Sequence, residues 1–181
     1  MDQPHDSTDH VDELDDALAA HAHAAATAQG AVIVECGLHR SHGSTSVYVV
    51  VHAADGMDAA RLGELTADLQ FRLGTEPVLD EATLEVSTPG INRKLKTDAE
   101  YEIFVGKAVR ILAEDADEWQ EGLIAAASGD HLTLAPLPGR DEEGASVPLT
   151  QIRKAQLTGA ERLAPGGRAH ANSRRENTDV E

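Results

Sequence analysis

The sequence predicts an α+β protein with two domains, the first an α-β-β-α-β unit and the second a small antiparallel β-barrel. Two observations support this division. Helical and extended patterns mix before residue 88, whereas short strand-like segments dominate after residue 106. Between the two regions stands Pro89-Gly90, in which the proline fixes its own φ and the glycine permits a sharp change of direction.

These patterns divide the chain into five segments. Residues 1–10 are polar and rich in Asp and His, which predicts a disordered N-terminal tail. After them we expect an N-terminal domain, an inter-domain linker, a C-terminal domain and a disordered C-terminal tail without apolar periodicity. Their predicted boundaries are 11–88, 89–97, 98–163 and 164–181.

Two amphipathic helices are predicted in the first domain. In the first helix, apolar residues recur at steps of three and four from Val11 to Ala25, and Gly30 ends the pattern. In the second helix, Asp58 is the expected N-cap and four leucines form one apolar stripe. These leucines are Leu62, Leu65, Leu69 and Leu73.

Three strands complete the first domain. Residues 31–40 and 45–52 have the composition of strands, and the short turn between them predicts an antiparallel hairpin. Residues 82–87 form the third predicted strand. A sheet this small is most economically buried with both helices on one of its faces.

The second domain begins with a short helix. Thr97 and Glu100 have the spacing of a capping box, Tyr101 and Phe104 are expected to point inward, and Gly106 ends the helix. The strands that follow have the spacing of a small antiparallel barrel. They are expected at 107–114, 118–127, 131–136, 146–150 and 154–159, with a 3₁₀ turn from Gln151 to Lys154 before the last.

Composition predicts a cytoplasmic protein. No apolar run approaches the ~18 residues that a membrane-spanning helix needs. The N-terminus is acidic where a signal peptide is basic and then apolar, and Cys36 is the single cysteine, so no internal disulfide can form. Aromatic residues make up only 3% of the chain, so the core is expected to consist of Val, Leu, Ile and Ala.

The chain is strongly acidic. It contains 32 Asp and Glu against 15 Lys and Arg, for a formal net charge of −17. A surface of this sign repels nucleic acid as a bulk polyanion and attracts basic proteins, so any contact with nucleic acid must be local. The alternative interpretation is that the acidity serves only solubility.

One basic segment interrupts this acidity. From Ser87 to Thr97 there is no acidic residue, and the segment contains Arg93, Lys94 and Lys96. As structure, these cations offset the surrounding acidity at a solvated turn; as function, they form a rigid arm that contacts phosphates or an acidic groove. The residues expected to form the inter-domain turn itself are Ser87, Pro89, Gly90 and Asn92.

The sequence predicts no catalytic residue, no cofactor and no metal site. It has no phosphate-binding glycine loop and no H-E-x-x-H or C-x-x-C motif, and its nine histidines do not complete a ligand set. Cys36 is expected to be a buried, inert thiol, and a nucleophilic role for Ser87 or Thr88 lacks a recognisable base. Trp119 has two interpretations, packing in the core or rim and a platform on which a base stacks.

The stretch from Leu84 to Gly106 resembles the signature of the bacterial ribosome maturation factor RimP family. The resemblance extends from about Val11 to Leu157 and includes a Gly-Leu-Ile strand after Trp119. The residues that match the central signature are Leu84, Glu85, Val86, Ser87, Pro89, Gly90, Ile91, Asn92, Arg93, Leu95, Phe104 and Gly106.

The resemblance implies a KH-like N-terminal domain and an SH3/Sm-like C-terminal barrel. It also implies a non-enzymatic role in maturing the small (30S) ribosomal subunit. We therefore expect a monomeric factor that binds the free or immature subunit transiently and assists its assembly. The implied partners are the small subunit, a basic ribosomal protein near the decoding centre and 16S rRNA. Arg93, Lys94 and Lys96 are then the expected contacts with the subunit or its rRNA. The rival interpretation is an acidic adaptor that binds proteins and never touches RNA.

The chain departs from the family pattern at three places. Thr88 replaces a serine, and Lys94 replaces a proline, which loosens the turn and adds a cation. The predicted hairpin at 114–118 is acidic where the family often carries basic residues. That acidity disfavours contact between this hairpin and RNA phosphates.

Overall fold

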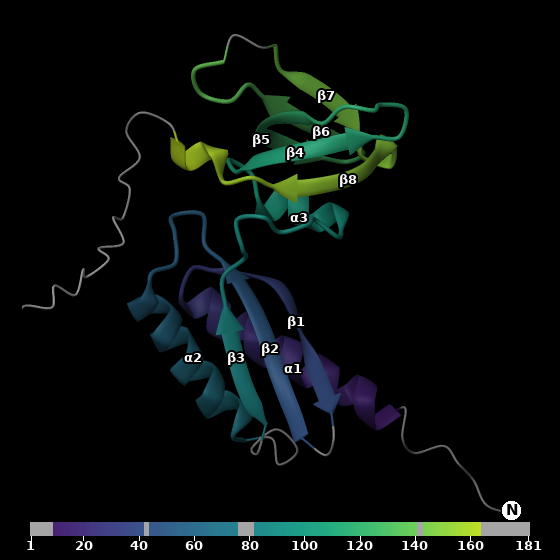
Figure 1. Ribbon diagram of the computed structural model, residues 1–181. Coiled ribbons are helices and arrows are strands. Elements are labelled where there is room, and N and C mark those ends of the chain that lie inside the picture. The colour runs from purple at the N-terminus through teal and green to yellow at the C-terminus, as the bar shows by residue number, and fades with distance from the viewer. Residues whose placement is uncertain (1–8, 42–43, 76–81, 141–142, 164–181) are drawn as a thin grey trace, which may run out of the picture. The chain divides into compact units, whose positions relative to one another are not determined.

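The protein is a mixed α+β structure whose chain divides into two units, Met1–Arg93 and Lys94–Glu181 (Figure 1). The computed structural model describes residues 9–41, 44–75, 82–140 and 143–163. The predicted C-terminal tail, most of the predicted N-terminal tail and the centre of the turn between the first two strands lie outside the described residues.

The first unit is a three-stranded sheet with two helices. The sheet has the order β1-β2-β3, with β1 antiparallel to β2 and β3 parallel to it. This is the predicted α-β-β-α-β order, although the first helix begins two residues earlier than expected, inside the segment predicted as tail. The elements are α1 (Asp9–Ala28), β1 (Val32–Ser41), β2 (Ser44–His52), α2 (Ala59–Leu73) and β3 (Thr83–Ser87).

Local signals explain where α2 begins and where α1 ends. The Asp58 carboxylate accepts a hydrogen bond from the Arg61 backbone N–H at 2.8 Å, which is the predicted N-cap. After α1, Gly30 has a φ of 60°, a value that glycine adopts without steric cost. Both helix boundaries are therefore readable from single residues.

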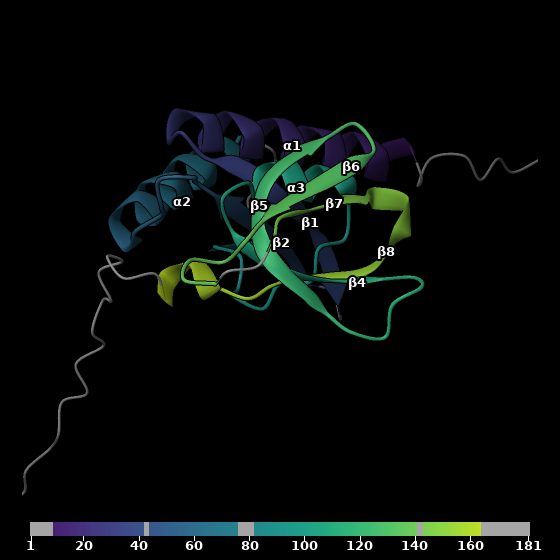
Figure 2. The ribbon, with the colours of Figure 1, turned by 90° about the horizontal axis from the view of Figure 1, so that it is seen from above.

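Both helices cover the same face of the first sheet (Figures 1 and 2). The predicted leucine stripe of α2 contributes Leu65, Leu69 and Leu73 to the core, with Leu62 packed at its margin. Strand β2 contributes alternate valines, because successive side chains of a strand point to opposite faces. These fully buried valines are Val47, Val49 and Val51.

The second unit is a five-stranded antiparallel sheet preceded by a short helix (Figure 1). Its strand order is β7-β6-β5-β4-β8. Within the described residues no hydrogen-bonded pairing joins the edge strands β7 and β8, so a closed barrel is not seen. The elements are α3 (Asp98–Ile103), β4 (Ala108–Ala113), β5 (Gln120–Ser128), β6 (His131–Ala135), β7 (Ala145–Pro148), η1 (Leu149–Gln151), β8 (Ile152–Leu157) and η2 (Ala160–Leu163).

Two details of the second unit differ from the sequence predictions. Thr97 is the N-cap of α3, but its side chain makes no capping hydrogen bond, so the predicted capping box is wrong. Glu100, the other member of that box, is buried with only 3% of its surface exposed. The 3₁₀ turn ends at Gln151 instead of beginning there, because Ile152 already pairs with Ala113 of β4.

The core of the second unit lies between α3 and the sheet. Tyr101 and Phe104 are buried as predicted, with Phe104 only 1% exposed. Burial raises the pKa of the Tyr101 phenol to about 12, so the ring enters the core in its neutral form. The sheet adds alternate apolar residues, among them Val109, Ile111 and Ile124.

Candidate functional site

The signature segment forms a turn at the end of the first unit. Ser87 is the last residue of β3 and pairs with Val50 of β2. The Arg93 backbone N–H donates to the Gly90 carbonyl at 3.0 Å, so the turn is centred on Ile91 and Asn92, after the Pro-Gly pair.

Gly90 is not required by steric constraints at its position. Its φ lies outside the left-handed region, and a Cβ built on it would meet no atom within 4 Å. A conformation that only glycine can adopt, which a Pro-Gly turn suggests, is therefore not present here. Gly90→Val is accordingly not expected to strain the turn.

Arg93 is bound within the first unit. Its guanidinium donates to the Glu35 carboxylate at 2.9 Å, and its side chain is only 11% exposed. Glu35 lies on β1, next to the position where the register of β1 against β2 shifts. A guanidinium held in this way positions the turn against the sheet and is a poor candidate for contact with an external phosphate.

Arg93→Ala is expected to lower the free energy of unfolding by about 1–2 kcal/mol, because it leaves a half-buried Glu35 carboxylate without its guanidinium. Urea titration followed by circular dichroism measures this loss. Arg40→Ala, at an exposed position of β1, removes the same charge and should change stability little. A double-mutant cycle with Glu35→Ala isolates the pair, and a coupling energy near zero would contradict the assignment.

Lys94 and Leu95 belong to the second unit. Lys94 forms an isolated antiparallel bridge with Gln156 of β8, and the Leu95 N–H donates to the Ala155 carbonyl at 3.0 Å. Lys94 and Lys96 are both exposed. The basic run of the sequence is thus divided, since its arginine is held by one unit and its first lysine is an added edge residue of the other sheet.

The bridge at Lys94 starts a row of polar side chains that crosses the second sheet. Gln156 stands opposite both Lys94 and Arg110, and Arg110 stands opposite Glu121 on its other side. Directly opposed residues of paired strands project from the same face. Lys94, Gln156, Arg110 and Glu121 therefore share one face, which Lys154 joins because it lies two residues before Gln156.

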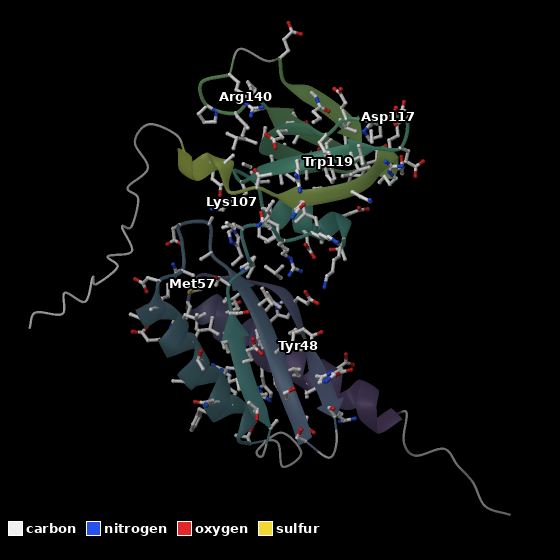
Figure 3. All side chains as sticks on the ribbon, in the orientation of Figure 1. Tyr48, Met57, Lys107, Asp117, Trp119 and Arg140 are labelled. Carbon is white, nitrogen blue, oxygen red and sulfur yellow. The ribbon has the colours of Figure 1, made fainter. Side chains whose placement is uncertain are left out.

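Trp119 completes this face. The Arg110 guanidinium lies over the indole ring, 4.7 Å from its centroid, and also donates two hydrogen bonds to the Gln156 side-chain oxygen, at 2.7 and 3.2 Å. Trp119 is 40% exposed, and Figure 3 shows where it lies in the second unit. Trp119 is thus a partly exposed rim residue with the Arg110 cation held over its ring. It combines features of both interpretations that the sequence left open.

Sequence reasoning missed Arg110 and Lys154. The alternation in β4 places Arg110 on the face opposite to Val109 and Ile111, and this signal was available. This alternation did not reveal that β8 pairs with β4 beside Arg110, or that Lys94 pairs with Gln156 of β8, because the partner of a strand is not encoded in neighbouring residues. The face that gathers these cations is therefore a product of strand order.

The described part of the chain offers little reactive chemistry. Among these residues, no group of three or more His, Cys, Asp or Glu is placed to hold a metal ion. Cys36 packs against the first core, and burial, together with Asp15 and Glu35, raises the pKa of its thiol. The raised pKa disfavours the thiolate, although Cys36 is only partly buried and not fully buried as predicted. No helix in the described ranges combines the length and apolar character needed to cross a membrane.

Comparison with known proteins identifies relatives over most of the chain. A protein of Borrelia hermsii (strain HS1 / DAH), called ribosome maturation factor RimP, is 32% identical over 130 residues, which cover 71% of this chain and 85% of the relative. A protein of the same name from Borrelia recurrentis (strain A1) is 33% identical over the same shares. A scan of protein-family models finds none that matches.

Proposed function

Because the chain belongs to the family of the ribosome maturation factor RimP, we propose that it binds the free or immature 30S ribosomal subunit transiently and assists its assembly without catalysis. The observation that carries this proposal is the alignment with relatives of that name over 85% of their length. We also propose that it acts in the cytoplasm as a monomer.

The proposed partners follow from charge. A chain with a net charge of −17 attracts basic proteins and repels bulk RNA. We propose that its protein partner is a basic ribosomal protein near the decoding centre. The exposed Lys94 and Lys96 are the proposed contacts with phosphates of 16S rRNA. Arg93, which the sequence suggested as a third contact, supports them by holding the turn through Glu35.

The finer fold assignment is also a proposal. We propose that the first unit is KH-like and that the second is an SH3/Sm-like small barrel. The antiparallel order β7-β6-β5-β4-β8 and the short helix before it support the second assignment. Such modules present sheet faces and loops to RNA or protein partners.

The test is sedimentation of the purified chain with 30S subunits over a range of salt concentrations, with 50S subunits as the negative control. Lys94→Ser with Lys96→Ser should weaken binding and flatten its salt dependence. Each lost phosphate contact should reduce the log–log slope by roughly 0.7–0.9. Arg40→Ser, in the first unit, is the control for a change of charge and should leave the slope intact. Absence of 30S binding by the unaltered chain would refute the proposal.

A protein-only adaptor is the second candidate function. The high acidity and the engagement of Arg93 by Glu35 favour it, because they reduce the cationic surface available to RNA. If this function is correct, an isolated basic ribosomal protein binds as well as the whole subunit does. The lysine variants then bind subunits with unaltered affinity and slope.

A further inference from the structure

We propose that one face of the second sheet binds single-stranded RNA, with a base stacked on Trp119 and phosphates on Lys94 and Lys154. We call this surface the Trp119 face; its residues are Lys94, Arg110, Trp119, Glu121, Lys154 and Gln156. The proposal rests on the proposed function, because it names how and where the subunit's RNA is held.

The indole is presented as a rigid platform. Arg110 lies on it at 4.7 Å and is itself held by Gln156, so the ring is supported from the strand beside it. The remaining indole surface is open, at 40% exposure. Bases stack on exposed aromatic rings irrespective of their sequence, and an adjacent arginine adds a cation–π contribution.

A hollow beside the indole has the size for a base. Its volume is about 390 Å³, and Trp119 forms part of its wall. The other lining residues are Glu118, Gln120, Glu121 and Arg140. Amide, carboxylate and guanidinium groups around an aromatic ring supply both donors and acceptors for the edge of a base.

The cations lie to one side of the indole. Lys94 and Lys154 are both exposed to solvent. From the backbone of Glu121 to that of Lys94 there are three strand spacings, roughly 14 Å in total. A single RNA strand that runs across the sheet in this direction would meet the indole first, then Arg110 and then the two lysines.

Acidic groups lie on β5, at Glu121, and in the loop between β4 and β5, beyond the end of β4. Glu121 is neutralised by Arg140, whose guanidinium donates to it at 3.2 Å. Asp115, Asp117 and Glu118 are exposed in the loop. They repel phosphates, so the RNA backbone is expected to run toward β8 and Lys94, away from the loop.

A basic peptide is the competing occupant, since the loop carboxylates would attract it. The row beside the indole argues against it. Lys94, Arg110 and Lys154 carry three positive charges on one face of a chain that is otherwise strongly acidic, and Glu121, the carboxylate on that face, is paired with Arg140. A cationic peptide would meet these charges directly, whereas an RNA phosphate finds its complement there.

The experiment uses Trp119 as its own reporter, because it is the only tryptophan of the chain. Titrating the full chain with a uridylate decanucleotide should quench its fluorescence, and anisotropy of the labelled oligonucleotide gives the affinity. Trp119→Leu should weaken binding by about 5- to 100-fold, whereas Trp119→Phe should stay within about threefold of the unaltered chain. Lys94→Ser and Lys154→Ser should each reduce the salt slope by about 0.7.

Matched variants separate a lost site from a lost fold. Lys94→Ser with Lys154→Ser changes only exposed side chains, so it tests the face even if Trp119→Leu is unstable. Arg40→Ser controls for charge, and Phe71→Ala on α2 controls for removal of an exposed aromatic ring. Circular dichroism confirms folding of each variant.

The acidic loop separates RNA from a basic peptide. Asp115→Asn with Asp117→Asn should strengthen oligonucleotide binding, whereas it would weaken binding of an oligoarginine peptide. The proposal is overturned if the oligonucleotide fails to quench Trp119, if folded Trp119→Leu and the double lysine variant both bind it normally, or if only the peptide binds.

Sedimentation with 30S subunits, run in parallel, keeps the two proposals distinct. Normal subunit binding by Trp119→Leu overturns the Trp119 face and leaves the proposed function standing. Failure of the unaltered chain to bind subunits refutes the proposed function whatever the oligonucleotide does.

Discussion

Phe104→Ala should lower the free energy of unfolding by about 3–5 kcal/mol, because it removes the largest fully buried side chain of the protein's described residues and leaves a cavity. The loss should be measured by urea titration, with fluorescence of Trp119 as the probe of the second unit. It should also abolish any binding that depends on the Trp119 face.

Phe71→Ala is the matched control for this change. Phe71 lies on α2 and is 78% exposed, so the same substitution deletes a phenyl ring that contacts solvent instead of one packed in a core. The expected change in stability is within about 0.5 kcal/mol. Equal losses of stability from Phe104→Ala and Phe71→Ala would contradict the burial of Phe104 in the core of the second unit.

Gly122→Val should destabilise the second unit by about 3 kcal/mol, because the added side chain has no space between β5 and β6. A Cβ at this position would lie 2.8 Å from the Ala135 carbonyl oxygen and 3.1 Å from the Leu134 Cβ. The oxygen belongs to the backbone of the paired strand, so it cannot move without disturbing the sheet. Thermal unfolding followed by circular dichroism measures the loss.

Gly63→Ala provides a contrast of opposite sign. Gly63 lies inside α2, and a Cβ there would meet nothing within 4 Å. Alanine should therefore stabilise the helix by about 0.5–1 kcal/mol through its better helical propensity. If Gly122→Val were as stable as the unaltered chain, the pairing of β5 with β6 would have to be revised.

Much of the secondary structure could be predicted from the sequence because its signals are local. Asp58 caps α2 by accepting a hydrogen bond from the backbone N–H of Arg61, three residues later, and the leucine stripe of that helix follows from residue spacing alone. The five strands of the second unit were expected within a few residues of their observed positions. The predicted capping box does not form, because the Thr97 side chain makes no capping hydrogen bond and Glu100 is buried in the folded unit.

The candidate site was only half visible from the sequence. The basic segment stood out by its lack of acid, and Trp119 by being unique. The sequence alone could not show that Arg93 would be taken up by Glu35, a partner 58 residues away. Nor could it show that Lys94 would join a row with Gln156 and Arg110.

The sequence by itself therefore determined the elements, the acidity and the position of the one basic turn, because periodicity, caps and charge are properties of neighbouring residues. The tertiary structure alone decided which cations are engaged and which share a face with Trp119. Strand order and register are decided by long-range pairing and burial, which act between residues far apart in the chain. Lys94 and Arg93 are neighbours in the sequence, yet one lies on the edge of the second sheet and the other is bound to Glu35 of the first.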